Sequence, residues 1–337
     1  MIVNREELKN ALRNVLLEEE NQHVYLKYER KEKALLVKSK STYLLSQVRC
    51  KVIEGKSTEL SVEHETNGSI LLYLLSYAKG DNCKLDFSDA LYVTCDTVKV
   101  ALPINRARKV EKTEKPLGRP TLLPLQDFLP LLEFSLLAPQ KEAVILERAV
   151  KISLREKKII FLATNGIFAK RRVAKAAGTE TADSLILRQP FLRLLSLQKE
   201  KLDQYFVSIY KNFVLVSTKD QTVTHTFFRI DRTFYELDDY FSSKSECKAD
   251  FSELFSLADL FPSIRLAVNT SDGYVRFYGK DFEEKVYYEG TYKGERAVCL
   301  PGKALSTLNG KKEMDFSIRK SGLLLKNQTE ELFIFRQ

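Results

Sequence analysis

The residues of this chain that could carry out chemistry are few and widely spaced. Its three histidines, His23, His64 and His225, each lie in or beside a stretch of alternating apolar and polar residues. A single histidine in such a strand is far more often structural than catalytic. The sequence has no GxSxG, no phosphate-binding glycine loop and no HExxH. Nothing here indicates an enzyme, although an active site without a recognisable motif stays open as an alternative.

The cysteines predict a reduced protein without a metal site. They are odd in number, scattered and form no CxxC pair: Cys50, Cys83, Cys95, Cys247 and Cys299. This pattern is typical of buried thiols in the cytoplasm and provides no set of metal ligands. The sequence contains no apolar run of membrane-spanning length, and its N-terminus lacks a signal-peptide pattern. We therefore expect a cytoplasmic protein with no membrane contact, no metal and no other cofactor.

The size and charge of the chain limit the remaining classes. Its 337 residues are enough for two or three domains, and a hydrophobic fraction of 44% with 20 Phe supports real cores. The net charge is +9, from 54 basic and 45 acidic residues. This excess favours a polyanionic partner, but it is diffuse and does not identify one.

A hairpin near the middle of the chain is the strongest local signal. Residues 161–170 read FLATNGIFAK, and Asn165-Gly166 favours a tight turn because both residue types tolerate a positive φ. Apolar residues end before this turn at Leu162 and restart at Ile167. An earlier turn is expected at Lys157-Lys158.

Around this hairpin, one order of elements is predicted three times. The first segment opens with a strand at 1–3 and a helix in which Leu8, Leu12 and Val15 share one face behind the N-cap Asn4. Strands are expected at 23–29, 34–38, 42–53 and 58–62, a second helix at 69–77, and strands at 83–87 and 91–103. The second segment should have a helix at 127–137, offset by Pro130, strands at 143–146, 150–154, 159–162 and 168–174, a helix from 189, and strands at 205–210, 213–219 and 222–230.

The third segment repeats this order in a shorter form. It should have a helix at 250–260, strands at 265–269, 274–279, 284–292 and 295–299, a helix at 301–308, and strands at 315–320, 323–326 and 331–335. Basic or polar connectors at 104–120 and 231–246 separate the segments. We therefore predict an α+β protein of three tandem similar domains, 1–117, 118–244 and 245–337, each with two helices packed on antiparallel sheets.

Taken together, this order resembles the bacterial β sliding clamp, the processivity factor of DNA polymerase III. The short strand and amphipathic helix at the start, the strands running into Leu102-Pro103, and the hairpin Ala163-Thr164-Asn165-Gly166 all resemble that family. So do Ile230 to Phe234, after the second domain, and the apolar end Phe333-Ile334-Phe335-Arg336-Gln337. The resemblance covers the whole chain in architecture but only short motifs in sequence.

The resemblance implies a DNA-clamp fold: a head-to-tail homodimer that closes into a ring around duplex DNA and does not act as an enzyme. Helices would line the hole and contact phosphates without reading bases. The basic residues on or just beyond predicted helices are then candidates for DNA binding: Lys9, Arg13, Lys79, Arg193, Lys199, Lys201, Lys303, Lys311 and Lys312. Each of them could equally be an ordinary surface residue.

The family also implies a cleft between the second and third domains that binds short apolar peptides of its partners. These partners are the DNA polymerase, the clamp loader and other proteins with the clamp-binding motif. Carried over, the cleft would be formed by Leu146, Thr164, Gly166, Phe168, Tyr235, Tyr240, Phe333, Ile334 and Phe335. The alternative is that these residues form the core of an ordinary domain junction.

Closure of the ring would pair the edge strand of domain one with domain three of a partner copy. Val98 and Val100 are the candidates on one side, and Leu260 and Phe261 on the other. The chain departs from the family at Ile167-Phe168, where the family has His-Arg, at Tyr235 and Asp239, where it has Pro and Arg, and in its basic charge. These departures indicate a divergent clamp with a different peptide preference.

The principal alternative is a β-rich protein that binds single-stranded nucleic acid in a basic groove lined with aromatic rings. Such a protein needs Tyr, Phe and Lys interleaved on one strand face. Residues 205–210, followed by Lys211, are the only stretch that fits.

Overall fold

The computed structural model describes all residues except 19–21, 56–62, 97, 107–114, 118–119, 138–142, 177–180, 242–246, 280–281, 307–313, 328–329 and 337. The chain forms two compact units. Unit 1 contains Met1–Leu129 and Ile186–Ile230, and unit 2 contains Pro130–Leu185 and Asp231–Gln337. The domain boundaries after residues 117 and 244 stay a prediction, since residues 118–244 are divided between the two units.

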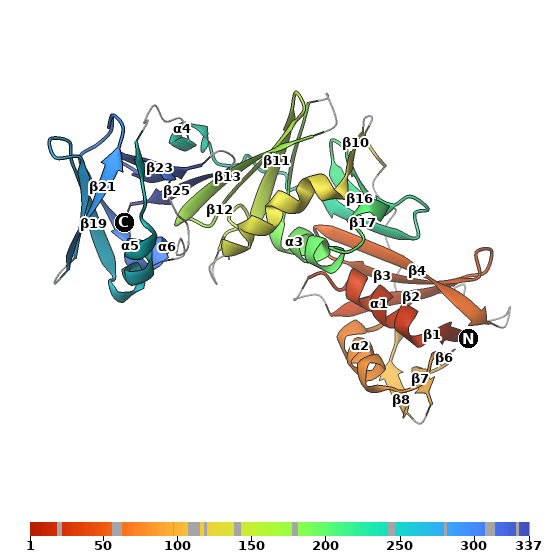
Figure 1. Ribbon diagram of the computed structural model, residues 1–337. Helices are drawn as coiled ribbons and strands as arrows, with labels where there is room; N and C mark the ends of the chain where they lie inside the picture. Colours follow the sequence, from red (N-terminus) through yellow and green to blue (C-terminus); the bar gives the residue numbers. More distant parts are fainter. Residues whose placement is uncertain are drawn as a thin grey trace. The chain divides into compact units, whose positions relative to one another are not determined.

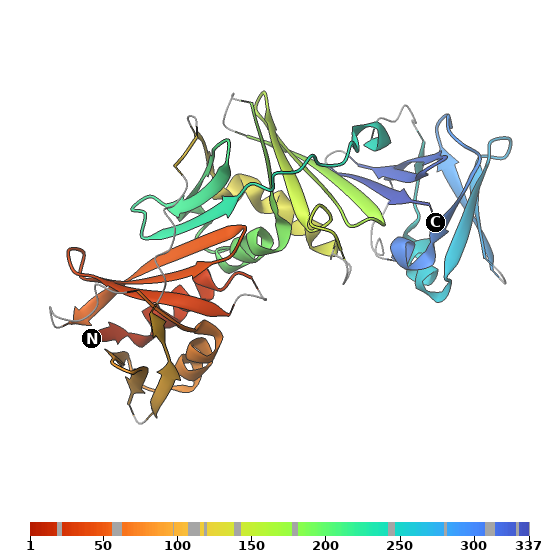
Figure 2. The same cartoon turned by 180° about the vertical axis from the view of Figure 1, so that it is seen from behind.

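Two helices pack on the first sheet of unit 1. Helix α1 (Arg5–Val15) begins at Asn4, whose Oδ1 accepts a hydrogen bond from Glu7 N at 3.0 Å. Its Leu8, Leu12 and Val15 are buried, as their spacing predicted. In Figure 1, α1 lies in front of strands β2–β4, and in Figure 2 it lies behind them, so the helix covers one face of that sheet.

Helix α2 (Gly68–Tyr77) starts directly after a strand. The side chain of Asn67 accepts a hydrogen bond from Ile70 N at 3.0 Å. A Cβ at Gly68 would lie only 2.4 Å from Cγ1 of Val24, so glycine is required where the helix begins against its neighbouring strand. The signals at both helix starts are local, which explains why the two helices could be located from sequence.

The first strands of unit 1 follow the order β5-β2-β3-β4-β1-β6-β7-β8. All neighbouring pairs are antiparallel. The strands are β1 (Ile2–Asn4), β2 (His23–Glu29), β3 (Ala34–Lys40), β4 (Leu44–Glu54), β5 (His64–Asn67), β6 (Asn82–Phe87), β7 (Ala90–Cys95), β8 (Val98–Pro103) and β9 (Asn105–Arg106), which pairs with β5.

The rest of unit 1 extends this sheet. Helix α3 (Arg188–Leu197) and the short 3-10 helix η2 (Leu202–Gln204) precede β15 (Tyr205–Ile209), β16 (Phe213–Thr218) and β17 (Val223–Phe228), and β10 (Thr121–Pro124) pairs with β15. Strand β17 pairs with β4, from Val223↔Val48 to Phe227↔Leu44. One continuous sheet therefore joins two segments of the chain that are about 180 residues apart.

Unit 2 also contains two groups of strands that join into one continuous sheet. One group of strands is β11 (Ala149–Arg155), β12 (Lys158–Thr164), β13 (Phe168–Lys175) and the start of β14 (Ala182–Leu187). The other contains β18 (Lys248–Ala249), β19 (Ser263–Asn269), β20 (Tyr274–Tyr278), β21 (Glu283–Glu289), β22 (Ala297–Pro301), β23 (Met314–Arg319), β24 (Gly322–Lys326) and β25 (Glu330–Phe335). Its helices are α4 (Asp238–Phe241), α5 (Ser252–Leu257), η3 (Ala258–Leu260) and α6 (Gly302–Ser306).

The predicted repeat is present in the strand pairing. The C-terminal strands run β22-β19-β20-β21-β18-β23-β24-β25, which matches β5-β2-β3-β4-β1-β6-β7-β8 position for position. Strand β25 pairs with β13 just as β17 pairs with β4. The α+β class is therefore confirmed, and the last strand of one repeat joins the fourth strand of the repeat before it.

Several sequence predictions of elements were wrong. Residues 127–137 are not an α-helix: 3-10 helix η1 spans Leu125–Leu136, because Pro130 lacks an amide hydrogen and clashes with the preceding turn. Residues 145–148 form a turn rather than the end of a strand at 143–146. The single strand expected at 91–103 is divided into β7 and β8, with Asp96 at φ +50° between them. Strands β5, β9, β10, β14 and β18 were missed, and the strand expected at 58–62 lies outside the described residues.

Candidate functional site

The central hairpin is held by side chains as well as by its backbone. Asn165 Oδ1 accepts hydrogen bonds from Ile167 N at 3.1 Å and Phe168 N at 2.9 Å. Thr164 Oγ1 donates to Phe168 O at 2.6 Å and accepts from Gly166 N at 3.1 Å. Of the two turn residues Asn165 and Gly166, only Gly166 has a positive φ, +84°. The hairpin is confirmed, but Asn165 acts through its carboxamide rather than through the backbone conformation that the sequence suggested.

The C-terminal strand lies directly against this hairpin. Strand β25 pairs with β13 from Phe168↔Ile334 to Arg172↔Glu330, and Phe335 N donates to Ile167 O at 3.0 Å. This pairing brings together the two ends of the predicted peptide site, which are more than 160 residues apart in the sequence. The side chains along a strand pair specify its register. The charged side chains of β13 and β25 therefore help to hold the predicted peptide site together.

A buried lysine fixes that register. Lys170 Nζ lies 2.6 Å from Glu330 Oε1 and donates to the backbone oxygen of Glu133 at 3.0 Å. Its side chain is only 3% exposed and its ammonium lies 5.3 Å from the centre of the Phe134 ring. Next to it, Arg171 forms an ion pair with Glu331. A basic strand thus faces an acidic one, and separation of the two strands would leave the Lys170 ammonium buried without the Glu330 carboxylate.

Aromatic side chains gather where β25 ends. The ring of Tyr240, on α4, lies 4.9 Å from that of Phe333 and 5.3 Å from that of Phe335. Arg171 lies 4.9 Å above the ring of Phe241 and 3.5 Å from Asp238, which ties α4 to β13. Of the predicted peptide-site residues here, Tyr240 and Phe335 are half-buried and reach the surface.

The other predicted peptide-site residues divide into surface and core. Tyr235 is 39% exposed and Gly166 is exposed. Leu146 is half-buried in the turn at 145–148. The remaining four, Thr164, Phe168, Phe333 and Ile334, are buried and therefore support the surface rather than form it.

Sequence reasoning missed one charged group at this place. The Glu147 carboxylate lies over the hairpin, with Oε1 at 3.1 Å from where a Cβ of Gly166 would stand. Burial raises the pKa of Tyr235, and the nearby charge of Glu147 raises it further. It directly follows the strand wrongly expected at 143–146, and no local pattern distinguishes it from other glutamates.

Four predicted DNA contacts are exposed in unit 1 on α1, on α3 and just beyond α3. These residues are Arg13, Arg193, Lys199 and Lys201. The ends of α1 and α3 meet there, since Gln198 Nε2 donates a hydrogen bond to Asn14 Oδ1. We call these four residues the unit 1 basic patch. Exposed Lys and Arg side chains can contact phosphate oxygens, and such contacts carry no sequence information.

The remaining predicted DNA contacts are less available or not described. Lys9 Nζ lies 2.5 Å from Glu6 Oε1, and its side chain is 14% exposed; hydrogen bonding to Lys9 lowers the pKa of Glu6. Lys79 is exposed just beyond α2. Lys303 lies on α6 but its side chain is not described, and Lys311 and Lys312 lie outside the described residues.

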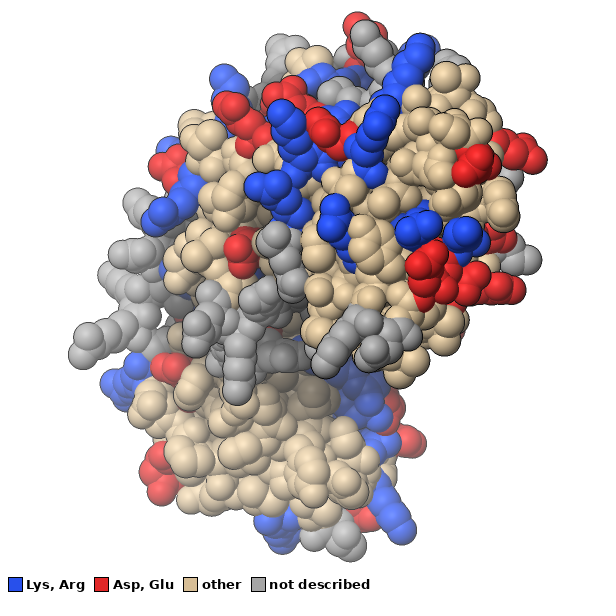
Figure 3. Space-filling model, turned by 90° about the vertical axis from the view of Figure 1, so that its left-hand side faces the viewer, with Lys and Arg blue, Asp and Glu red and all other residues tan. Residues whose placement is uncertain are grey.

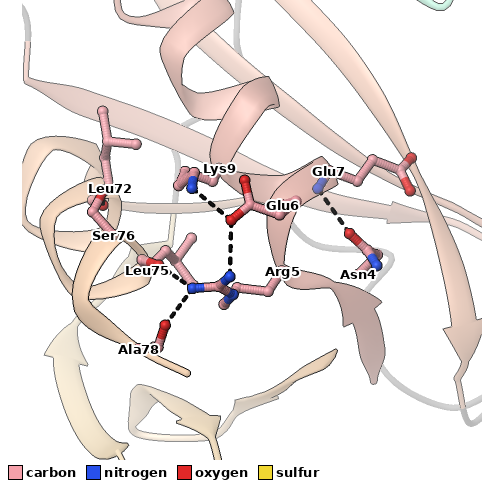
Figure 4. A network of polar contacts seen from close by, with 9 residues as sticks. All are labelled: Asn4, Arg5, Glu6, Glu7, Lys9, Leu72, Leu75, Ser76 and Ala78. Atoms are coloured by element: carbon pink, nitrogen blue, oxygen red, sulfur yellow. Dashed lines mark hydrogen bonds and ion pairs between the residues drawn. The ribbon is translucent and has the colours of Figure 1, made fainter. Parts of the chain in front are cut away.

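Lys9 belongs to a network that joins the two helices of the first repeat, drawn in Figure 4. Arg5 Nη1 donates to the backbone oxygen atoms of Leu75, at 3.2 Å, and Ala78, at the C-terminus of α2. Arg5 Nη2 also donates to Glu6 Oε1 at 2.8 Å. A cation at this helix end satisfies carbonyl groups that no helical amide reaches.

On the one face that Figure 3 draws, the coloured charges do not form a surface of one sign. Figure 3 shows Lys and Arg side chains standing beside Asp and Glu on the face it draws. Ion pairs such as Arg276 with Glu283, at 3.3 Å, belong to the strands of unit 2. The excess of +9 is therefore spread along the chain, as its sequence suggested.

Strands β8 and β21 each leave an edge without a partner among the described residues, as do the outer strands β9, β10, β14 and β22. Strand β8, with Val98 and Val100, pairs only with β7. The first five residues of β21 pair with β20, while only its last two pair with β18. Near the start of β21, Phe261 stacks on Phe282 at 4.9 Å, and Leu260 is 73% exposed.

The groups that could do other chemistry are buried or isolated. His225 is fully buried, with Nδ1 at 3.0 Å from Ser46 Oγ, and burial lowers its pKa to about 3. Within the described residues, no three His, Cys, Asp or Glu side chains are close enough to hold a metal ion. No described helix is long and apolar enough to cross a membrane. Tyr205 is buried, so of the aromatic residues in 205–210 only Phe206 and Tyr210, both half-buried, reach the surface.

Comparison with known proteins identifies the fold by structure but not by sequence. No sequence model of a protein family matches the chain, and no curated protein matches it by sequence. Solved structures match it over its whole length. The DNA polymerase III subunit beta from Pseudomonas aeruginosa matches with a TM-score of 0.79 and 15% identity, over 99% of that chain. The DNA polymerase III beta subunit from Thermotoga maritima matches with a TM-score of 0.80 and 14% identity, over 98% of that chain. A DNA polymerase sliding clamp from Pseudomonas aeruginosa, with ligand, matches with a TM-score of 0.78 and 15% identity over 99% of its length. The chain therefore has the fold of the bacterial DNA polymerase III β subunits, the sliding clamps.

Proposed function

We propose that the protein is a sliding clamp, a homodimeric ring that encircles duplex DNA and tethers a DNA polymerase to it. The observation that carries this proposal is the repeated strand pairing. Strand β17 pairs with β4, and β25 pairs with β13, so each repeat adds its last strand to the fourth strand of the repeat before it. The fold shared with solved sliding clamps supports the same conclusion.

If the last strand of every repeat pairs with the fourth strand of another repeat, two strands of each chain still lack a partner. Strand β8 ends the first repeat and has no earlier repeat to join, and β21 is the fourth strand of the last repeat. Two copies arranged head to tail satisfy both: β8 of each copy pairs with β21 of the other. Uncovered edges of this kind would otherwise invite aggregation. Val98 and Val100 then belong to the subunit interface through their strand.

The helices beside these edges have matching apolar surfaces. At the β17·β4 pair within one chain, α3 meets α1 through Gln198 and Asn14. The equivalent helices at the subunit contact are α2 of one copy and α5 with η3 of the other. Their exposed apolar residues are Ile70, Tyr73, Tyr77, Leu257 and Leu260. Rows of exposed apolar residues mark protein interfaces, and Phe261 supports the second row from its stack on Phe282.

Light scattering at several concentrations tests the dimer. We expect twice the 38.8 kDa mass of the chain. Tyr77→Glu or Leu260→Arg should produce monomers, because each places a charge in an apolar contact. Leu122→Glu is the matched control, since Leu122 is 60% exposed on β10, at the opposite end of the sheet order from β8. A monomeric wild-type chain at micromolar concentration would contradict the ring.

The contacts to DNA would be made by the unit 1 basic patch together with Lys9, Lys79, Lys303, Lys311 and Lys312. A ring needs only weak, mobile phosphate contacts, because encirclement keeps it on the duplex. We expect Arg13→Gln with Lys199→Gln to lower the salt dependence of duplex binding by about two phosphate contacts, in proportion to the charges removed. The charge-matched control is Lys211→Gln with Lys219→Gln, which removes two exposed charges on either side of β16.

The partner site would be the surface formed by Gly166, Tyr235, Tyr240 and Phe335, with Leu146 beside it and Thr164, Phe168, Phe333 and Ile334 beneath. Aromatic rings held on a rigid strand pair suit a short peptide with apolar anchors. The polymerase, the clamp loader and other proteins that bear such a peptide would compete for it. Because the chain has Ile167 beside the turn and Glu147 above it, its preferred peptide would differ from those of other clamps.

A further inference from the structure

Two buried cysteines of the first repeat face each other across neighbouring strands. Strands β6 and β7 pair with Lys84↔Thr94 and Leu85↔Val93, and one further step of the same register places Cys83 opposite Cys95. Both thiols are buried in one core cluster, at 0% and 1% exposure, and they share a hydrogen bond. This contact is specific to the pair, because the register places no other described cysteine across from either one.

The backbone spacing at such a position suits a disulfide. Residues directly opposed in antiparallel strands have Cα atoms roughly 4.5 or 5.5 Å apart. A disulfide joins Cα atoms that are about 4.4–6.8 Å apart, so Cys83 and Cys95 could be bridged without moving either strand.

A cation beside the pair favours the reactive form of one thiol. The hydrogen bond from Cys83 lowers the pKa of Cys95, and the positive charge of Arg5 lowers it further, against the effect of burial. The Nε–H of Arg5 is buried and has no hydrogen-bond acceptor among the described residues, while its Nη1 is bound to carbonyl groups of α2. Arg5 therefore supplies positive charge to a thiolate at Cys95, which is the nucleophilic form of cysteine.

We propose that Cys83 and Cys95 form a redox-active dithiol, a modification site that a small two-electron oxidant converts into a disulfide. The oxidant is a low-molecular-weight disulfide or a diazene such as diamide. The Cys95 thiolate attacks it and forms a covalent adduct: a disulfide reagent breaks its S–S bond and releases one half as a thiolate, whereas a diazene bonds to sulfur through one nitrogen and takes a proton on the other. Cys83 then loses its proton, attacks the Cys95 sulfur and expels the reduced reagent. Two electrons pass to the oxidant, and the two thiol protons end on it or in solvent.

The bridge would act on the free edge of the repeat. It would tie β6 to β7, the strand on which β8 pairs. Opening of β7 away from β6 then becomes impossible without breaking a covalent bond. We expect amide hydrogen exchange in β7 and β8 to slow at least several-fold after oxidation, because fraying of this edge requires that opening.

The other cysteines provide internal controls. Cys50 is buried alone: its thiol donates to Glu7 O at 3.9 Å, and burial raises its pKa. Cys299 is exposed on β22. A reaction governed by exposure alone would modify Cys299, whereas one governed by pairing links Cys83 to Cys95. The two cases give different products from the same sample.

The test is oxidation of the folded wild-type protein with diamide, followed by alkylation in denaturant and digestion without reduction. We expect a linked peptide pair that contains Cys83 and Cys95, reversed by dithiothreitol. The link should form unchanged in Cys50→Ala and be lost in Cys95→Ala. The proposal is overturned if both cysteines are alkylated while Cys299 has reacted, or if the link forms only after urea unfolds the protein.

Discussion

The ion pair between Lys170 and Glu330 gives the sharpest prediction about the candidate peptide site. Glu330→Gln removes the charge that faces the Lys170 ammonium at 2.6 Å, where the side chains are 3% and 8% exposed. Breaking a buried pair from one side costs about 3–5 kcal/mol because the other charge is left in a low dielectric. The Lys170 ammonium keeps the backbone oxygen of Glu133 at 3.0 Å and its carboxylate at 3.7 Å, so we lower the expectation to about 2–3 kcal/mol.

Amide hydrogen exchange measures this loss where it occurs. A global unfolding curve is not suitable, because a protein of two compact units need not unfold in one step. Opening of β25 from β13 should become about 30–150 times more frequent in Glu330→Gln, as 2–3 kcal/mol implies. Arg155→Gln is the matched control: its pair with Asp183 is about half exposed and should change exchange by less than about 1 kcal/mol.

A double variant distinguishes charge from packing. Lys170→Met with Glu330→Leu removes both charges and keeps similar volumes, so strand opening should return to within about 1 kcal/mol of the wild type. If Glu330→Gln exchanges like the wild type, or if the double variant opens as readily as the single one, the ion pair does not hold the C-terminal strand in register.

Three further predictions follow from other parts of the chain. Tyr240→Ala should weaken binding of a peptide with apolar anchors at least tenfold in fluorescence anisotropy, since its ring contacts two phenylalanines, whereas Tyr210→Ala in unit 1 should not. Burial lowers the pKa of His225 to about 3 in the folded state, so the free energy of opening β17 should fall by about 1.4 kcal/mol per pH unit as the pH decreases from 6.5 toward 3; His225→Gln should remove this slope from amide hydrogen exchange of β17 between pH 6.5 and 5. Replacing Glu156-Lys157, both at positive φ, by Asn-Gly should stabilise the turn by about 1 kcal/mol, and unchanged hydrogen exchange of β12 would contradict this.

Where a structural signal is local, the sequence was enough to predict it. Helix α1 follows from Asn4 and the spacing of Leu8, Leu12 and Val15, and the hairpin follows from Asn165-Gly166. The order of the elements in three repeats could be predicted for the same reason. The low sequence identity between the repeats did not prevent this prediction, because each helix start has its own capping residue and each turn its own turn residues.

What the sequence could not provide depends on distant residues. Lys170 meets Glu330 only because β25 returns to β13, and 160 positions separate them. The 3-10 form of η1 depends on how Pro130 is accommodated in an apolar stretch that otherwise reads as α-helix. Lys9 looked like a free cation on a helix, but it is paired with Glu6. Surface charges are the least predictable part, since neighbours within a few ångströms decide whether they are available.

The central claim is that the protein holds DNA by encircling it. The most direct measurement is retention of the labelled protein on a nicked circular duplex, followed by cutting that duplex once with a restriction enzyme. The account predicts that the protein stays on the circle through gel filtration at moderate salt and is released when the circle becomes linear. Equal retention before and after the cut would show that the protein binds as a groove binder does, and that no ring surrounds the duplex.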